Sequence, residues 1–435
     1  MYMHVKFTFV HINENNEKGN LKMKDVQLIV YQNPLFIYGQ EYIPGSRIKH
    51  TAVFVKPELK IYYIGGNNPD NLEQNPESDI FYLDIINTTK NFFSSWVNLK
   101  SQGVKLPHTF SHTANIGGAN QDSVYIIGGA HWNANNTNFL YRFDTKTNEL
   151  SVPVIEGKAP QSRIEMNSVS NEGKIYIFGG RTYTLNESVS IYVNQFDILD
   201  TINLNWQVGS LVNSPVALSG YTATLVNGII YYIGGRSQQY VFSPMTEIFT
   251  YDIVGNKWSL KKATTADIET MPGSRTGHSA VSFDGKIFVY GGSYFNGDTS
   301  YDMPAKKTFV MLDTVNLVWS IPPLNDTNVP ELAYHTATLL ADTSSMILTF
   351  GNLMSVPIRS DNLIYLFYLD DPNFRWYKIT PPPILLPKPS DTSSTSTPTE
   401  TSSPDKLVIV SVSVGLVAVV LTICVVYYRY KKGKS

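Results

Sequence analysis

The chain has 435 residues, of which 16% are charged and 12% are aromatic, and it holds 29 glycines and 24 prolines. Few charges with many aromatic and turn residues favour a β-protein. A net charge of -2 provides no cationic field for a phosphate backbone, so nucleic acid is excluded as an expected partner. Cys424 is the only cysteine, which excludes intramolecular disulfides and cysteine-based metal or nucleophile sites in the rest of the chain.

Residues 1–45 form an N-terminal segment that is a poor match to a signal peptide. Its apolar stretch, 26–39, is interrupted by Gln32, Asn33 and Pro34, and a further polar segment precedes it. We interpret the segment either as a degenerate signal peptide or as a strand that closes the ring of repeats described next.

Residues 46–380 contain six copies of a short apolar run that ends in paired glycines. The copies are IYYIGG at 61–66, VYIIGG at 124–129, IYIFGG at 175–180, IYYIGG at 230–235, IFVYGG at 287–292 and a degraded ILTFGN at 347–352. A histidine, with a small residue two positions later, precedes four of the runs, at His50, His112, His278 and His335. Met166 and Tyr221 replace the histidine in the third and fourth copies.

An apolar residue followed by aspartate comes after each run. The pairs are Leu83–Asp84, Phe143–Asp144, Phe196–Asp197, Tyr251–Asp252, Leu312–Asp313 and Leu369–Asp370. Five tryptophans follow on one phase, at Trp96, Trp206, Trp258, Trp319 and Trp376, and Leu150 takes that place in the second copy. The coincidence of several landmarks at similar offsets indicates a true structural repeat.

Each repeat predicts one blade of four antiparallel strands. The apolar runs suit a strand whose sheet is covered on both faces, and paired glycines permit a sharp exit into a loop. The aspartate begins a hairpin turn, and the tryptophan packs against the neighbouring blade. Because one blade cannot bury both of its faces, we expect an all-β fold with six blades closed radially into a propeller.

The order of apolar run, glycine pair, aspartate and tryptophan resembles the kelch repeat. Together with the C-terminal features below, it is similar to the single-pass kelch membrane proteins of fungi that are often labelled by similarity to galactose oxidase. The resemblance implies the propeller fold and not copper chemistry, since the copper site needs a cysteine cross-linked to tyrosine and Cys424 lies outside the repeats. The 45 residues before the repeats also leave no room for the BTB domain of ubiquitin-ligase adaptors.

The C-terminal region predicts a stalk, a membrane span and a tail. Residues 381–405 are rich in serine, threonine and proline, which favours an extended spacer. Residues 407–428 carry no charge and are long enough for a transmembrane helix. The basic residues of 429–435 indicate a cytosolic tail by the positive-inside rule.

The sequence favours a propeller outside the cell or in a lumen, with cell-surface localisation. Four acceptor sites for N-glycosylation support this topology, at Asn87, Asn135, Asn186 and Asn325. The alternative is a tail-anchored cytosolic scaffold, such as a cell-polarity type kelch protein, because the signal peptide is poor.

No catalytic motif was found, so we expect no enzyme activity, no cofactor and no metal site. The four repeat histidines are interpreted as structural, and two sets of arginines are candidates for either the channel mouth or structural roles. These are Arg47, Arg163 and Arg275, before the histidine position, and Arg181 and Arg236, after the glycine pairs. A carbohydrate-active enzyme is the less favoured alternative, because it would require paired carboxylates about 5 to 9.5 Å apart in the central pocket and no acidic pair stands outside the repeat phase. We also expect no cluster of convergent ionisable side chains at the hub.

The loops after the glycine pairs are predicted to form a binding surface for a protein or glycan ligand. They hold residue types that dominate interfaces, at Trp132, Arg181, Tyr183, Arg236, Tyr240, Phe242, Tyr294 and Phe295. The sequence does not identify the ligand.

Overall fold

The computed structural model describes residues 42–379, apart from 71–76, 86–95, 132–137, 183–189, 296–301, 325–327 and 355–358. All described residues belong to one compact unit, Tyr38–Pro383. The predicted stalk, transmembrane helix and tail, and most of the N-terminal segment, lie outside them. No helix of the described part has the length and hydropathy that a membrane span requires.

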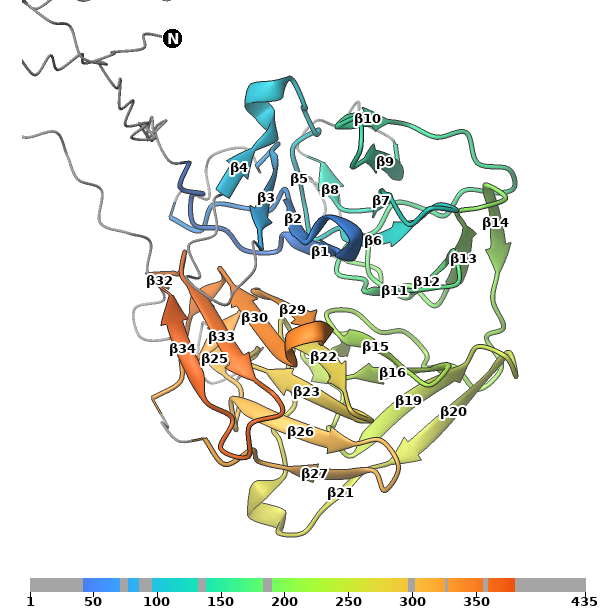
Figure 1. The fold of residues 1–435 in the computed structure, drawn as a ribbon. Coiled ribbons are helices and arrows are strands. Elements are labelled where there is room, and N and C mark those ends of the chain that lie inside the picture. Colours follow the sequence, from blue (N-terminus) through green and yellow to red (C-terminus); the bar gives the residue numbers. More distant parts are fainter. Residues whose placement is uncertain are drawn as a thin grey trace, which may run out of the picture. The chain divides into compact units, whose positions relative to one another are not determined.

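The described strands form six antiparallel blades, each built from one continuous stretch of the chain (Figure 1). From inner to outer strand, the first three are β1 (Thr51–Val55), β2 (Lys60–Ile64), β3 (Ile80–Asp84) and β4 (Trp96–Asn98); β6 (Thr113–Gly117), β7 (Ser123–Ile127), β9 (Leu140–Asp144) and β10 (Glu149–Ser151); and β11 (Ser168–Asn171), β12 (Lys174–Phe178), β13 (Phe196–Asp200) and β14 (Asn205–Val208).

The last three blades are β15 (Thr222–Val226), β16 (Ile229–Ile233), β19 (Glu247–Asp252) and β20 (Lys257–Lys262); β22 (Ser279–Phe283), β23 (Lys286–Tyr290), β26 (Phe309–Asp313) and β27 (Val318–Ser320); and β29 (Thr336–Leu340), β30 (Ser345–Thr349), β33 (Ile364–Tyr368) and β34 (Trp376–Ile379). The short strand β21 (Thr264–Thr265) adds to the fifth blade, parallel to β27.

The blades close into a ring, which confirms the predicted six-bladed propeller. Each inner strand contacts the inner strand of the next blade, and β29 of the last blade contacts β1 of the first (Figure 1). The first and last blades are each complete in themselves, so the described ring closes by packing between blades and not by a shared strand. The ring-closing strand expected within residues 1–45 falls almost wholly outside the described residues and stays a prediction.

Smaller strands on the loops carry the surface that is described below. The pairs are β5 (Thr109–Phe110) with β8 (Ala130–His131), β17 (Arg236–Gln238) with β18 (Val241–Phe242), and β24 (Ser293–Phe295) with β25 (Asp302–Pro304); β28 (Leu332–Ala333), β31 (Asn352–Leu353) and β32 (Arg359–Ser360) form a three-stranded sheet. Four 3-10 helices complete the described elements: η1 (Lys56–Glu58), η2 (Leu99–Gln102), η3 (Ile268–Thr270) and η4 (Ala341–Thr343).

A hydrophobic cluster fills each junction between neighbouring blades of the described ring. Each of the five tryptophans on the repeat phase belongs to the cluster between its own blade and the preceding one, and Leu150 does the same in the second blade. The predicted packing of tryptophan against a neighbouring blade is thus confirmed. Burial of such large rings is the main favourable term that holds the blades together.

The repeat histidines link the inner strands by hydrogen bonds, as their structural interpretation predicted. Each Nε2 bonds a hydroxyl at the start of the preceding inner strand: His112 with Thr51 at 2.8 Å, His278 with Thr222 at 3.1 Å, His335 with Ser279 at 2.7 Å and His50 with Thr336 at 3.1 Å. The last of these bonds spans the closure of the ring.

The two junctions without histidine keep the link by other chemistry. In the third blade, the hydroxyls of Ser168 and Thr113 share a hydrogen bond of 2.7 Å. In the fourth, the Tyr221 hydroxyl donates to the backbone carbonyls of Asn167, at 3.0 Å, and Phe178. All six described junctions therefore contain a polar contact next to the apolar cluster.

The glycine pair is required because the next blade approaches the first glycine and the histidine of the same blade approaches the second. In the fifth blade Gly291 has φ 63° and Gly292 has φ 97°, both in the left-handed region. A Cβ on Gly291 would lie 2.0 Å from the carbonyl oxygen of Leu332, and a Cβ on Gly292 would lie 2.9 Å from the Cβ of His278. Any larger residue would separate the blades or strain the turn.

The sixth copy departs from the register that its sequence suggested. Thr349 pairs with Ile364 as Ile64 pairs with Ile80, so Phe350 occupies the first glycine position and Gly351 the second. The alignment of Asn352 with the second glycine is wrong by one residue. Phe350 has a φ of 58°, and its ring packs edge-on against the ring of His50, with 5.2 Å between the two centroids, at the closure between the last and first blades.

The aspartate phase was wrong in two copies. In the third blade Asp200, not Asp197, pairs opposite Lys174 and accepts the turn amides of Ile202 and Asn203, which restores a six-residue spacing to Trp206. In the sixth, Tyr368 occupies the equivalent position opposite Ser345, so Leu369–Asp370 is out of phase. Asp144 and Asp313 accept turn amides as predicted.

The arginines before the histidine position are buried. Of their two candidate roles, at the channel mouth or within the structure, they have the structural one. Arg47 pairs with Asp79 at 3.0 Å, and Arg163 pairs with Asp197. Arg275 has no carboxylate and instead donates to four backbone carbonyls, among them that of Gly291 at 2.9 Å. Burial lowers the pKa of Arg275 to about 10.

The histidine links make the ring sensitive to acid. Burial lowers the pKa of both His278 and His335 to about 3, well below the value of about 6.5 expected in the unfolded chain. The unfolded chain therefore binds more protons below about pH 6.5, and stability falls as the pH decreases from there toward 3. Each histidine should cost about 1.4 kcal/mol of unfolding free energy per pH unit in this window.

We expect His278→Met with His335→Met, which copies the residue found at Met166, to flatten this dependence. Urea unfolding of both proteins between pH 7 and pH 4 measures it. Because the carboxylates titrate equally in both, the difference between the two curves isolates the histidines. Parallel curves would show that the histidines do not carry the effect.

Candidate binding face

The residue directly before each histidine position forms the innermost ring of the propeller. All six have a positive φ, between 55° and 66°: Lys49, Ser111, Glu165, Gly220, Gly277 and Tyr334. At five of the six junctions the N–H of this residue donates to the carbonyl at the same position of the preceding blade, with distances of 2.7 to 3.1 Å. Between the fourth and fifth blades the Thr276 hydroxyl donates to the Gly220 carbonyl at 3.0 Å.

The residue after each glycine pair forms a second ring beside the first. In every blade it makes a backbone bridge with the residue two before the histidine position: Ile48 with Asn67, Phe110 with Ala130, Ile164 with Arg181, Ser219 with Arg236, Thr276 with Ser293, and Ala333 with Asn352. The glycine turns and the approach to the inner strand thus lie on the same face. We call this surface the hub face.

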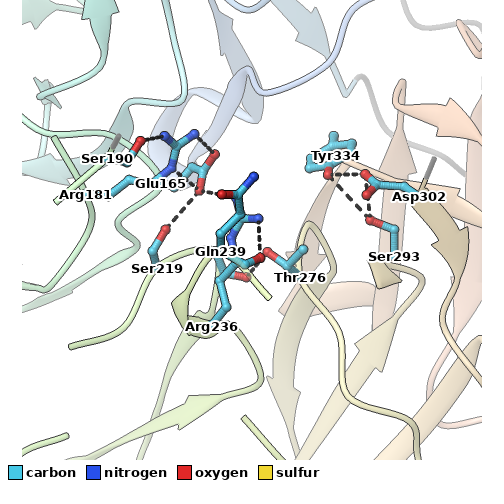
Figure 2. Close-up of polar contacts among 11 residues, drawn as sticks. Glu165, Arg181, Ser190, Ser219, Arg236, Gln239, Thr276, Ser293, Asp302 and Tyr334 are labelled. Atoms are coloured by element: carbon cyan, nitrogen blue, oxygen red, sulfur yellow. Dashed lines mark hydrogen bonds and ion pairs between the residues drawn. The ribbon is translucent and has the colours of Figure 1, made fainter. Parts of the chain in front are cut away.

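Glu165 is the centre of a polar network on the hub face, shown in Figure 2. Arg181 donates from Nε to Oε2 at 2.9 Å and from Nη2 to Oε1 at 2.7 Å, in a bidentate pair. Arg236 of the next blade donates to Oε2 at 3.1 Å, and the Ser219 hydroxyl does so at 2.9 Å. The Glu165 side chain is 13% exposed, so these are strong, partly buried contacts.

The network joins the hub to the loops. Arg181 also donates to the hydroxyl of Ser190 at 2.6 Å, and Arg236 donates to the carbonyl of Gln239 at 3.3 Å, in the turn between β17 and β18. One carboxylate therefore sets the position of two guanidinium groups and, through Arg236, of a projecting hairpin.

A second polar group lies across the hub face, in Figure 2, on the fifth and sixth blades. The Tyr334 hydroxyl donates to Asp302 Oδ2 at 2.7 Å, and the Ser293 hydroxyl donates to the same oxygen at 3.3 Å. The Nζ of Lys49 lies 5.1 Å from the centroid of the Tyr334 ring, in a cation–π contact.

The charges of the hub face lower the pKa of the Glu165 carboxyl group. Burial favours the protonated form of Glu165, but the hydrogen bonds and charges of Arg181 and Arg236 outweigh it and hold its pKa far below the ordinary value. Glu165 therefore stays ionised and is unsuited to donate a proton, the role that a general acid in a glycosidase must fill. Among the described residues, no group of three or more histidine, cysteine, aspartate or glutamate side chains could hold a metal ion.

An aromatic pair extends the hub face over the fourth and fifth blades. The rings of Tyr240 and Phe295, from the β17–β18 and β24–β25 hairpins, are 4.9 Å apart between centroids. Tyr240 is 59% exposed, whereas Phe242, Tyr294 and Phe295 are half-buried. These two hairpins carry four of the aromatic residues that the sequence singled out.

The structure brings together six of the predicted binding residues and omits two. Arg181, Arg236, Tyr240, Phe242, Tyr294 and Phe295 lie on or next to the hub face. Trp132, Tyr183 and all four glycosylation acceptors, Asn87, Asn135, Asn186 and Asn325, lie outside the described residues. Their assignment as site residues stays a prediction.

Sequence reasoning missed Glu165, Lys49, Asp302 and Tyr334. The expectation that the hub has no convergent ionisable side chains is wrong, because Glu165 pairs there with Arg181 and Arg236, and Tyr334 contacts both Asp302 and Lys49. Lys49, Glu165 and Tyr334 occupy the same repeat position, immediately before the histidine position. The residue type at this position varies from copy to copy, and that variation was the signal in the sequence that could have pointed to it. That their side chains gather around one axis could be seen only in the closed ring of blades.

We expect Glu165→Gln to lower the unfolding free energy by about 1–3 kcal/mol, because two partly buried guanidinium groups lose their carboxylate. Chemical denaturation at neutral pH measures the loss. Asp342→Asn is the matched control, since the Lys56–Asp342 pair also joins two blades but both side chains are more than 60% exposed. Equal effects of the two changes would refute a special role of the Glu165 network.

Comparisons with known proteins agree with this architecture. The family model for the KLHDC2/KLHL20/DRC7 Kelch-repeats domain matches residues 49–292, and the Kelch motif model matches residues 274–323. The solved structure titled "Structure of YjhT" superposes with a TM-score of 0.60 over 78% of this chain and 99% of that chain, at 13% identity, which shows a shared fold.

Curated relatives match parts of the chain. Kelch domain-containing protein 3 of Rattus norvegicus is 27% identical over 179 residues, 39% of this chain and 44% of that protein. Leucine-zipper-like transcriptional regulator 1 homolog of Drosophila melanogaster is 23% identical over 336 residues, 73% of this chain and 31% of that protein. The chain thus spans less than half the length of these relatives. The family model covers more than half of the chain, and the chain belongs to the kelch-repeat family.

Proposed function

We propose that this kelch propeller is a non-enzymatic binding module that captures a protein ligand on its hub face. The observation that carries the proposal is the Tyr240–Phe295 pair, which two different blades present beside Arg236. Exposed aromatic side chains next to arginine are the residue types that contribute most to protein interfaces. Kelch relatives named for their repeats, rather than for a reaction, support a binding role over a catalytic one.

The charge of the hub face favours an acidic group on the ligand. Lys49, Arg181 and Arg236 outnumber Glu165 and Asp302 by one charge. A carboxylate or another anionic group of the partner would complement this excess positive charge. The aromatic pair would then contribute apolar area at the edge of the same contact.

A protein and glycan array probed with the full chain tests this function. We expect wild-type protein to bind one or more arrayed proteins, and Tyr240→Ala with Phe295→Ala to weaken these signals by about tenfold or more, as removal of an interface hot spot does. Thermal unfolding should change little, because Tyr240 is largely exposed and neither Tyr240 nor Phe295 belongs to the hydrophobic clusters between the blades.

The matched control is Val254→Ser with Val315→Ser, two exposed apolar residues in the hairpin turns at the ends of β19 and β26 away from the hub face. This variant should bind like wild type. Equal loss in both variants, or no loss in either, would remove the hub face from the site. Signals confined to glycans would replace the protein ligand with a carbohydrate.

We further propose that residues 407–428 anchor the propeller to a membrane, with the stalk 381–405 as spacer and the propeller outside the cell or in a lumen. The uncharged length of the segment and the basic residues after it support this, together with the four acceptor sites. A tail-anchored cytosolic scaffold is the alternative that the poor signal peptide favours.

Glycosidase digestion of the protein expressed in a eukaryotic cell separates these topologies. The proposed one predicts that the protein stays with membranes at alkaline pH and gains mobility on a gel after removal of N-glycans. Replacement of Asn87, Asn135, Asn186 and Asn325 by Gln should abolish the mobility shift. Membrane-bound protein without any glycan would support the cytosolic alternative.

A further inference from the structure

Strand β20 is the outermost strand of the fourth blade and the longest outer strand of the described ring (Figure 1). It spans six residues, whereas the other outer strands span three or four. Two of those are also covered, because β21 pairs with β27 and Glu156 makes a bridge with Asn205 of β14. No strand among the described residues pairs with the outer edge of β20. A long unpaired edge offers its backbone groups to another extended chain.

The pairing of β20 with β19 shows which backbone groups face outward. Every residue of β20 has a partner in β19, and the N–H of Ala263, just beyond the strand, donates to the carbonyl of Thr246 at 2.8 Å. Because inward and outward groups alternate along an antiparallel strand, those of Trp258, Leu260 and Lys262 point away from the sheet. They take part in none of the backbone hydrogen bonds formed among the described residues. Trp258 is buried, but Leu260 is 45% exposed and Lys262 is exposed, so a partner can reach this end of the edge.

One face of β20 is basic. Lys257, Ser259 and Lys261 share this face, because side chains alternate along a strand, and both lysines are exposed. None of the ion pairs formed among the described residues includes Lys257 or Lys261, whereas Lys262 pairs with Glu247. Two positive charges four residues apart therefore lie along the edge without a carboxylate partner in this part of the chain.

The other face of β20 is apolar. It carries Trp258 and Leu260, and the indole Nε1 of Trp258 donates to the carbonyl of Ser210 at 2.7 Å. The residues that follow Ser210 are Leu211, which is 39% exposed, and Val212, which is 71% exposed. Exposed aliphatic side chains thus lie beside this face, where apolar residues of a partner would bury them.

We propose that the edge of β20 is a second docking site, separate from the hub face, and that it binds an extended acidic segment of another protein as an added strand. Acidic side chains of the partner face Lys257 and Lys261, and its alternate apolar side chains face Leu260 and Leu211. A second copy of this chain does not fit, because two such edges would bring lysines opposite lysines. The site does not depend on the proposed function of the hub face.

The test is titration of the full chain into a labelled peptide with the alternating pattern Glu-Val-Thr-Val-Glu and blocked ends. Fluorescence anisotropy at low ionic strength should show saturable binding. A peptide with lysine in place of glutamate should not bind. A peptide with methyl groups on the backbone nitrogens of valine and threonine keeps its side chains but cannot donate to the edge, so it should bind at least about tenfold more weakly.

Charge reversal of the edge provides the second arm. Lys257→Glu with Lys261→Glu should weaken binding of the glutamate peptide at least about fivefold and allow the lysine peptide to bind, because opposite charges across paired strands attract and like charges repel. Lys100→Glu with Lys105→Glu is the matched control, since both lysines are exposed, lie near η2 and change the net charge equally. This control should bind like wild type, and thermal unfolding confirms that both variants are folded.

Amide hydrogen exchange on the wild-type chain gives an independent readout. Exchange at Leu260 should slow when the glutamate peptide is bound, because its N–H then donates to the added strand. No saturable binding of the glutamate peptide would overturn the proposal. Equal binding of the methylated peptide, equal loss in both protein variants, or unchanged exchange at Leu260 would also overturn it.

Discussion

The polar contact between neighbouring inner strands is the constraint on which this propeller depends. At four junctions a buried histidine bonds a hydroxyl of the preceding blade, and at the other two Ser168 and Tyr221 make the link. Packing alone would let the blades slide, since apolar contacts have no direction. A hydrogen bond at the same height of every junction sets the register between blades, and burial between two sheets makes its loss costly.

The same constraint explains the repeat motif and creates the hub. The glycine pair is needed because the histidine and the backbone of the next blade occupy the space of a Cβ. The residue before the histidine is forced into the left-handed region by the ring of backbone hydrogen bonds around the axis. Its side chain has no part in that ring, so six positions are free to vary. In this chain two are glycine, and Lys49, Glu165 and Tyr334 supply the charge and aromatic surface.

The repeat pattern predicted the fold well because each of its landmarks has a local cause. Apolar runs form buried strands, aspartates accept turn amides, and tryptophans pack on the preceding blade, all within about 56 residues of chain. The errors occurred where a similar residue lies nearby. In the third copy Asp197, which pairs with the buried Arg163, was taken for the turn residue Asp200. In the sixth copy Phe350 stands at the first glycine position, where its ring packs at the closure between the last and first blades, so the glycine position was assigned one residue too late. The register of strand pairing shows which of two similar nearby residues occupies the repeat position, whereas the residue types alone do not.

The sequence by itself determined the number of blades, their strand order and the face on which the long loops emerge, because these follow from spacing along the chain. Only the tertiary structure decided which side chains meet at the hub. Glu165 and Arg236 belong to different blades, as do Asp302 and Tyr334, and nothing in their local sequence indicates that the members of each pair approach each other. Ring closure brings them together, since a radial arrangement converts equivalent positions in distant repeats into neighbours around one axis.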